Sequence, residues 1–193
     1  MEGIIKFKAN KTSNKLISSE ELERINPFRK ICFEKKYIGI GIDGIGYGNI
    51  SYRSGINNEF IISASATGGI LDLEIEDYSR VTTFNISSNS LSCEGVKLAS
   101  SESLSHAAIY KTNNNIKAVI HIHNAQLWEK HIDNLPTTPT YAKYGTQAMA
   151  DSISEIINKK KTHYGIIIMG GHKEGILSYG NTLNECIKAL NNL

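Results

Sequence analysis

Two short and almost wholly apolar runs constrain the fold of this chain more than any other feature. They are IKAVIHI at residues 116–122 and YGIIIM at residues 164–169. Apolar runs of this length predict strands rather than helices, because helices in domains need more residues. Polar and apolar residues do not alternate in them, which predicts strands that are buried on both faces. The sequence therefore predicts a sheet in the interior, with other elements packed on both of its sides.

The rest of the chain supplies further strands and the helices. We expect strands at residues 50–53, 59–63, 79–84 and 96–99, and helices at residues 19–36, 100–110, 144–160 and 183–190. Pro27 interrupts the first helical pattern, which predicts either a kink or two short helices. Because strands and helices do not alternate strictly, we expect a layered α/β fold with a largely antiparallel sheet. The chain shows no internal repeat or linker, so residues 1–193 are interpreted as one domain with residues 1–18 at its periphery.

Composition and charge exclude several classes of protein. The net charge is only +2, from 21 basic and 19 acidic residues, and the only basic run, Lys159–Lys161, contains no aromatic residue. We therefore expect no nucleic-acid partner. No segment approaches the ~20 apolar residues that span a bilayer, and the N-terminus lacks a signal-peptide pattern, so we expect no membrane partner. The three cysteines have no CxxC spacing, which is typical of unbridged thiols in a reducing compartment and predicts a cytoplasmic protein.

The segment AVIHIHN carries the residues best suited to bind a metal. Residues i and i+2 of a strand point to the same face, so His121 and His123 are expected to project together. An isolated His-x-His is equally compatible with two polar residues at the end of a strand. His172 follows the second buried strand and is a candidate for a third ligand. Three imidazoles and one open position are typical of a catalytic rather than a structural zinc site.

A carboxylate lies in the segment SSESLSH, at the expected start of the helix at residues 100–110. Beside a metal, Glu102 could transfer protons during catalysis. The alternative is an ordinary glutamate of the first helical turn, which the helix dipole favours. Taken alone, Glu102 fits this second interpretation better.

Five segments in the same order make the chain resemble the class II aldolase and adducin superfamily. They are YGNISYR, FIISASATGG, ASSESLSHAAIY, AVIHIHN and IIIMGGHKEGILSYG, and the match extends from about Ile38 to Leu190. They are similar to the family's Gly-Asn-aliphatic-Ser-x-Arg strand, its Thr-Pro-Ser/Thr-Gly segment, its Ser-Ser-Glu helix start, its two-histidine strand and its third-ligand segment. The resemblance implies a three-layer α/β/α domain. It also implies a homotetramer with active sites between neighbouring subunits.

The resemblance also assigns roles to the candidate residues. It implies that one Zn²⁺ per subunit is held by His121, His123 and His172, with manganese, cobalt or iron as alternatives because imidazoles bind all of them, and that Glu102 is the acid–base residue. It implies a phosphate pocket formed by Asn49, Thr67, Gly68, Ser100 and Ser101. TYAKYGT at residues 140–146 is similar to the branch of the family that cleaves L-fuculose 1-phosphate, which implies that Tyr141 handles the proton at the aldehyde end. A buried tyrosine bonded to the backbone is the alternative for Tyr141.

The activity that the resemblance implies is cleavage of a sugar phosphate. A ketose phosphate would be split reversibly, by a retro-aldol reaction, into dihydroxyacetone phosphate or a similar ketone and an aldehyde. Because a fold does not determine a reaction, a methylthioribulose-1-phosphate dehydratase and a pentulose-phosphate 4-epimerase are the alternatives. A non-catalytic adducin-like module is a more distant one, since adducin-type domains lose the metal histidines. The chain departs from the family pattern at Lys173 and Glu174, which separate His172 from Gly175, and at Ala66, where proline is usual.

Overall fold

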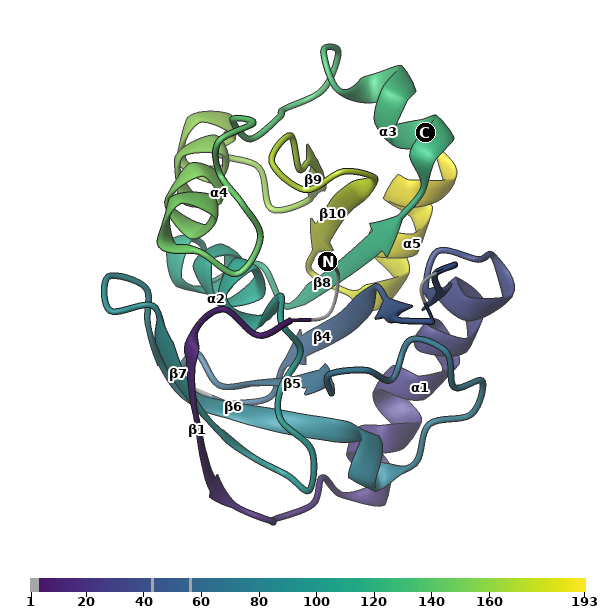
Figure 1. Cartoon of the computed structure of the whole chain (residues 1–193), viewed down its shortest axis with the longest axis vertical. Coiled ribbons are helices and arrows are strands. Elements are labelled where there is room, and N and C mark those ends of the chain that lie inside the picture. Colours follow the sequence, from purple (N-terminus) through teal and green to yellow (C-terminus); the bar gives the residue numbers. More distant parts are fainter. Residues whose placement is uncertain (1–3, 43, 56) are drawn as a thin grey trace.

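An eight-stranded sheet forms the centre of the protein (Figure 1). The computed structural model describes residues 4–42, 44–55 and 57–193. The strands of this sheet are β1 (Lys8–Ser13), β4 (Asn49–Arg53), β5 (Phe60–Ser63), β6 (Tyr78–Asn85), β7 (Ser90–Glu94), β8 (Ala118–His123), β9 (Gly165–Ile168) and β10 (Gly175–Gly180). Their order is β1-β7-β6-β5-β4-β8-β10-β9, and each neighbouring pair is antiparallel except β1 and β7. A separate small hairpin consists of β2 (Gly39–Ile40) and β3 (Gly46–Tyr47).

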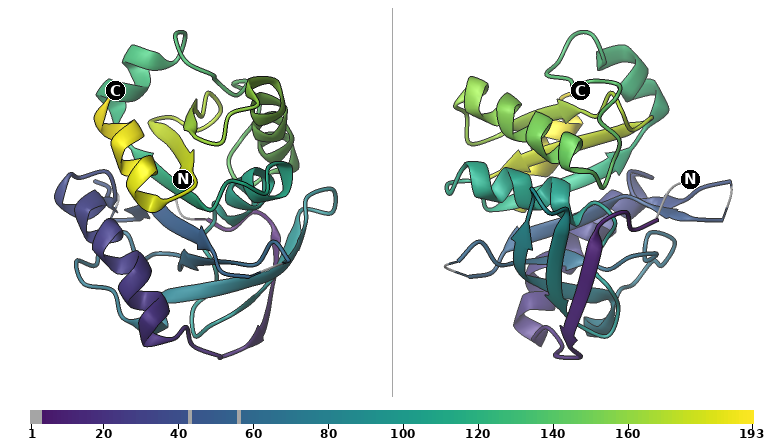
Figure 2. Two further views of the ribbon diagram at one scale, coloured as in Figure 1. Left: turned by 180° about the vertical axis from the view of Figure 1, so that it is seen from behind. Right: turned by 60° about the vertical axis from the view of Figure 1, so that its left-hand side comes forward.

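Helices cover both faces of the large sheet (Figure 2). They are α1 (Ser19–Glu34), α2 (Ser103–Thr112), α3 (Ala125–His131), α4 (Gln147–Lys160) and α5 (Leu183–Asn191), besides a 3-10 turn at Ile75–Asp77. None of the helices in the described residues is long and apolar enough to cross a membrane. Apolar residues of α2 and α4 form one core with the sheet, and those of α1 and α5 form a second core on the opposite face. Alternate residues of β8 divide between the two, since Val119 joins the first core and Ile120 the second. The predicted three-layer fold with a largely antiparallel sheet is confirmed.

Most of the predicted strands are present. The strands expected at residues 50–53, 59–63, 79–84, 116–122 and 164–169 correspond to β4, β5, β6, β8 and β9. The strand predicted at residues 96–99 is wrong, because Val96 is 46% and Leu98 37% exposed in a loop. The sheet instead uses the preceding segment as β7, in which Leu91 and Cys93 are buried between half-buried polar residues. Val96 and Leu98 therefore lie at the surface, and of this segment's apolar residues Ala99 is buried in the first core.

The predicted helices are also present, with shifted ends. α1 continues as one helix through Pro27, so the alternative of two short helices is wrong. A capping box fixes its start: Ser18 Oγ accepts a hydrogen bond from the Glu21 N–H at 3.2 Å, and the Glu21 carboxylate accepts one from the Ser18 N–H at 2.9 Å. α3 and β10 were not predicted from the sequence.

The N-terminal segment joins the sheet at its edge. Of residues 1–18, which we expect at the periphery, residues 8–13 form β1 at one end of the strand order. Phe7 is buried in the core beneath α2 and α4. Residues 1–3 lie outside the described part of the chain. This segment therefore contributes an edge strand and two buried residues to the domain, Phe7 in the first core and Ile17 in the second.

Candidate metal centre

Three histidines converge where β8 meets the β9–β10 hairpin. His121 and His123 lie on β8, and His172 lies in the turn between β9 and β10. Gly175, the first residue of β10, pairs with His123 and so returns this turn to β8. A larger residue would not fit at Gly175, because its Cβ would lie 2.6 Å from His172 Cδ2 and 3.2 Å from His121 Nε2. The glycine thus makes room for the histidine cluster.

The three imidazoles are close enough to bind one ion. Their candidate ligand atoms lie within 4.8 Å of one another, and His123 Nε2 is 3.1 Å from His172 Nε2. Zinc with tetrahedral geometry and bonds of 2.0–2.1 Å would place two ligand nitrogens about 3.3 Å apart. His121 Nε2 is buried and has no hydrogen-bond partner among the described residues, as expected of an atom that binds a metal. The donor set therefore fits a divalent ion of the zinc type.

Burial keeps His121 neutral. It has no exposed surface, and this burial, followed by the electrostatic coupling to the imidazoles of His123, His172 and His106, holds the pKa of His121 well below its usual value. A neutral imidazole retains the lone pair that a metal requires. His106 itself lies outside the cluster. Its Nδ1 is 2.6 Å from Ser51 Oγ, and burial lowers its pKa to about 3, so it is a neutral residue of the core.

Asn49 contacts the metal cluster from the neighbouring strand. It pairs with His121 across β4 and β8, and its Nδ2 lies 3.2 Å from His121 Nδ1. Its Oδ1 is buried without a hydrogen-bond partner in the described structure. If the Asn49 side-chain amide is rotated by 180°, its Oδ1 takes the place of Nδ2 and accepts a hydrogen bond from His121 Nδ1–H. The lone pair on His121 Nε2 is then available to a metal. Asn49 therefore fits a role in orienting His121, in addition to the phosphate contact that the family resemblance implies.

Glu102 lies beside the histidines. It is the N-cap of α2, one position before the first helical turn where the sequence placed it, and it is 1% exposed. Its Oε1 is 3.8 Å from His172 Nε2, and its Oε2 accepts a hydrogen bond from Ser105 Oγ at 2.7 Å. A carboxylate buried this deeply is costly unless neighbouring groups stabilise it. The position next to a metal ligand fits an acid–base residue better than a surface helix cap.

The five residues expected to bind phosphate line one small cavity next to this carboxylate. These residues are Asn49, Thr67, Gly68, Ser100 and Ser101. The backbone N–H groups of residues 66–69 donate no hydrogen bond to any described residue. Ser100 Oγ accepts a hydrogen bond from the Glu102 N–H at 3.3 Å, which joins the cavity to the acid–base candidate. Free amides, hydroxyls and a nearby helix N-terminus are the groups that bind phosphate oxygens.

The backbone explains why the cavity loop lacks the family's proline. Ala66 has a φ of 62°, whereas the proline ring fixes φ near −65°. The next glycine is required for packing, since a Cβ on Gly68 would lie 2.5 Å from the carbonyl oxygen of Gly39. The β2–β3 hairpin therefore lies directly against this loop. The departure at Ala66 changes the local backbone and keeps Thr67 and Gly68 at the cavity.

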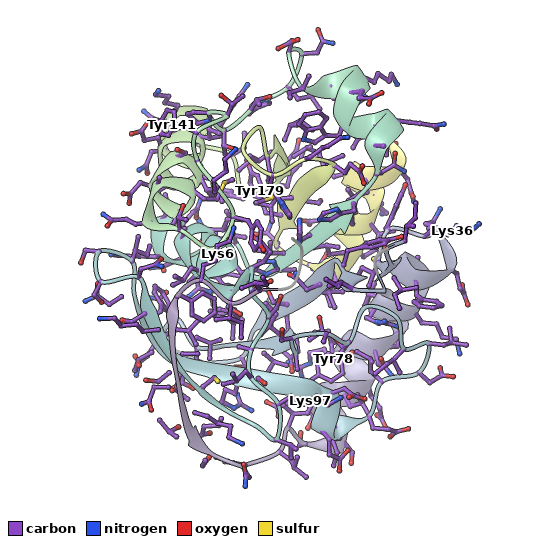
Figure 3. All side chains as sticks on the ribbon, in the orientation of Figure 1. Lys6, Lys36, Tyr78, Lys97, Tyr141 and Tyr179 are labelled. Carbon is purple, nitrogen blue, oxygen red and sulfur yellow. The ribbon has the colours of Figure 1, made fainter. Side chains whose placement is uncertain are left out.

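Tyr141 is not brought to the histidines within this chain. Its side chain is 74% exposed and lies at the edge of the molecule beside α4 (Figure 3). The alternative of a buried tyrosine is therefore wrong. The structure places another tyrosine of the same segment at the site: the Tyr144 ring is 4.7 Å from that of His172, and Lys6 Nζ lies 3.4 Å above the Tyr144 ring. Lys6 could not be predicted from the sequence, because its contact with Tyr144 depends on the fold of the N-terminal segment.

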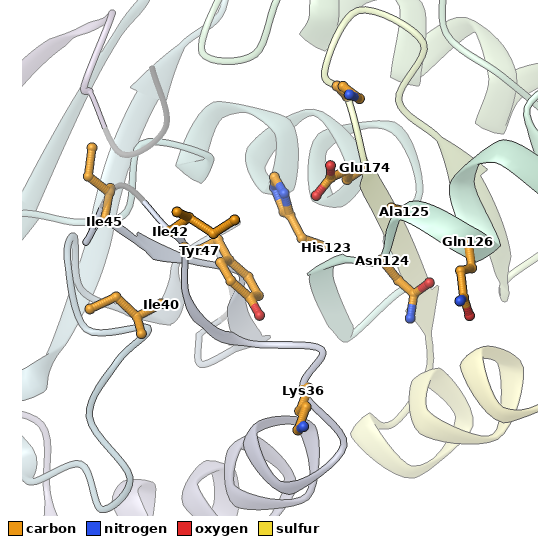
Figure 4. A pocket seen from close by; sticks show the side chains of 12 residues that line it. Lys36, Ile40, Ile42, Ile45, Tyr47, His123, Asn124, Ala125, Gln126 and Glu174 are labelled. Carbon is orange, nitrogen blue, oxygen red and sulfur yellow. The ribbon is translucent and has the colours of Figure 1, made fainter.

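A wider cavity opens on the other side of His123. Its lining includes Lys173 and Glu174, the two residues that depart from the family pattern. It also includes Lys36 and apolar residues of the β2–β3 hairpin, among them Ile40 (Figure 4). Lys173 and Glu174 therefore face the approach to the metal cluster.

Comparison with known proteins agrees with the fold. A solved structure of L-fuculose 1-phosphate aldolase is similar, with 20% sequence identity and a TM-score of 0.68 over 91% of this chain and 82% of that chain. A protein of Klebsiella pneumoniae, described as an aldolase, epimerase or decarboxylase, has 17% identity and a TM-score of 0.66 over 91% of this chain and 86% of that chain. A sugar-phosphate aldolase of Thermotoga maritima is also similar, with 13% identity and a TM-score of 0.62 over 86% of this chain and 87% of that chain. At these identities the likeness shows the fold alone. No curated protein matches the sequence. The profile described as "Class II Aldolase and Adducin N-terminal domain" matches residues 35–193, and the chain therefore belongs to the class II aldolase and adducin family.

Proposed function

We propose that this chain is a zinc-dependent aldolase that cleaves a ketose phosphate reversibly into dihydroxyacetone phosphate, or a similar ketone, and an aldehyde. One observation carries the proposal: Glu102 lies 3.8 Å from a histidine of the metal cluster and donates its N–H to Ser100 in the phosphate cavity. A proton-transfer group, metal ligands and anion donors therefore meet at one place. A purely structural adducin-like module would have no need of a buried carboxylate beside three histidines.

Each group has a distinct task in the proposed reaction. A divalent ion on the histidines would act as a Lewis acid on the substrate carbonyl and stabilise the negative charge left when the carbon–carbon bond breaks. The phosphate cavity fixes the ketone end of the substrate relative to the histidines. As the carbon–carbon bond breaks, the hydroxyl of the aldehyde half becomes a carbonyl and gives its proton to Tyr141 or to a water. Glu102, which Ser105 orients, gives a proton to the carbon that has lost its bond to the aldehyde half, and both transfers are reversed in the other direction.

Metal analysis followed by a substrate screen tests this proposal. We expect about one zinc ion per chain, the content of a three-histidine site. We also expect aldehyde release from at least one phosphorylated ketose, measured by coupled reduction of the aldehyde, and loss of this activity in a chelator. Water loss without carbon–carbon cleavage would identify a dehydratase, and interconversion of pentulose phosphates an epimerase. A metal-free protein that turns over none of these substrates would contradict the proposal.

We further propose that the enzyme is a homotetramer in which Tyr141 serves the site of a neighbouring subunit. The exposure of Tyr141 supports this role, because a tyrosine that acts across a boundary must point out of its own chain. Trp128, which could also anchor a subunit contact, does not support it. Its Nε1 donates a hydrogen bond to the carbonyl of Met169 at 3.1 Å, and its ring packs against the chain's own core.

Light scattering and a mixing experiment test the assembly. We expect a tetramer at micromolar protein, and a roughly hundredfold lower turnover in Tyr141→Phe, because the phenol handles a proton. Tyr164→Phe is the matched control, since Tyr164 is 63% exposed elsewhere on the surface. Hybrids of Tyr141→Phe and Glu102→Gln subunits should regain activity, because a shared site can take its tyrosine and its glutamate from different chains. An active monomer, or hybrids without recovery, would contradict the shared site.

A further inference from the structure

An arginine without a carboxylate partner lies buried behind the phosphate cavity. Arg29, on α1, is 0% exposed, and its contacts among the described residues include no acidic side chain. The nearest acidic residues of that region are engaged elsewhere: Asp77 pairs with Lys97 at 2.6 Å and Asp72 with Lys30 at 3.0 Å. Burial lowers the pKa of Arg29, the direction expected of a cation removed from water. Asp77 and Asp72 favour its charge only from a distance, and a buried cation that no carboxylate contacts is costly, so a further group with negative charge is expected nearby.

The guanidinium is bonded instead to the loop that lines the cavity. Nη2 donates hydrogen bonds to the carbonyl oxygens of Thr67 and Gly68, both at 3.0 Å, and Nη1 donates to the carbonyl of Leu71 at 2.8 Å. Asn26, one turn earlier on α1, adds a hydrogen bond to the carbonyl of Leu73 at 3.0 Å. The residues of one helix face therefore hold the whole loop from Thr67 to Leu73.

These bonds determine which way the loop amides point. In a trans peptide, the carbonyl of one residue and the N–H of the next point in opposite directions. Because the carbonyls of Thr67 and Gly68 turn toward Arg29, the N–H groups of Gly68 and Gly69 turn away from it. Neither N–H donates a hydrogen bond within the described structure, and Gly68 lines the cavity. The arginine thus leaves two amides available to an anion on the opposite side of the loop.

We propose that Arg29 is a positioning residue of the phosphate site, which orients the N–H groups of Gly68 and Gly69 and supplies positive charge behind a bound phosphate dianion. The proposal rests on the phosphate pocket of the proposed function and extends it to a residue on another helix. Arg29 does not touch the substrate. It acts through the loop carbonyls and through its charge, which remains effective at short range in the protein interior.

Titration of inorganic phosphate by calorimetry, at constant ionic strength, tests this role. Arg29→Met removes the charge and the three hydrogen bonds, and Arg29→Lys keeps the charge without the planar fork that reaches three carbonyls. Arg24→Met is the matched control, because Arg24 lies on the exposed face of the same helix and pairs with Glu20 at 3.1 Å. We expect phosphate to bind Arg29→Met about tenfold or more weakly. Arg29→Lys should recover part of the loss, Arg24→Met should match the wild type, and the metal content should stay the same in all three.

The outcomes separate this inference from the proposed function. Equal phosphate affinity in the wild type and Arg29→Met would overturn the role of Arg29 and leave the aldolase proposal standing. Absence of phosphate binding in the wild type would overturn both, because the cavity would then not be a phosphate site. If Arg29→Met does not fold, Arg29→Lys decides the question: weaker binding than in the wild type supports the inference, and equal binding overturns it.

Discussion

Replacing Glu102 by glutamine is expected to lower turnover of the ketose phosphate by roughly two or more orders of magnitude, the scale of a lost acid–base group. An amide of nearly the same shape can still accept the hydrogen bond from Ser105 Oγ, so the start of α2 should keep its structure. It cannot exchange the proton at the reacting carbon. The fold, by circular dichroism, and the metal content, by elemental analysis, should therefore remain close to those of the wild type.

Two further variants show whether the effect belongs to this carboxylate. Glu155→Gln, on the exposed face of α4, removes a similar charge away from the site and should leave turnover unchanged. Ser105→Ala removes the donor that holds Oε2 and should give a smaller loss than Glu102→Gln, because the carboxylate remains but is less well oriented. Wild-type turnover by Glu102→Gln on the true substrate would mean that Glu102 is only the cap of α2.

The part of the site that depends on local periodicity could be predicted from the sequence. The spacing of His121 and His123 on a buried strand was enough to place both imidazoles on one face. The position of His172 beside them depends on β10, which returns to pair with β8 through Gly175. That strand was not predicted, because the segment GGHKEG at its start has the composition of a loop or turn. His172 was a candidate from its position after the second buried strand, the family resemblance made it a ligand, and the structure explains its place through the hairpin.

Contacts between distant segments are what the sequence could not supply. The strand order brings β1 beside β7, and the packing of α1 brings Arg29 to carbonyls about forty positions later in the chain. No periodic pattern encodes such pairings, since they depend on the whole fold. The strand predicted at residues 96–99 failed for a related reason: Val96 and Leu98 match a strand locally but are exposed in the structure. Local pattern identified elements, and tertiary packing decided which of them form the sheet.

Replacing His121 or His123 by alanine is expected to remove most of the bound metal and, with it, the activity. Each change deletes one of three imidazole ligands, and the two that remain form a much weaker site. Asn49→Ala should have an intermediate effect, about 10- to 100-fold in metal affinity, because groups that orient a ligand contribute on that scale. His163→Ala is the control, since His163 is exposed and bonded to Asn113 rather than to the cluster.

Elemental analysis of the folded variants after dialysis measures the effect directly, and thermal melting separates metal loss from unfolding. The order of metal content among the four variants tests the site more strictly than the content of any one variant. Loss in both histidine variants, partial loss in Asn49→Ala and full content in His163→Ala would assign the site to these side chains. Full stoichiometry in both His121→Ala and His123→Ala would show that the metal binds elsewhere. In that case the 3.1 Å approach of His123 Nε2 to His172 Nε2 would reflect a hydrogen bond between two imidazoles and not a site for an ion.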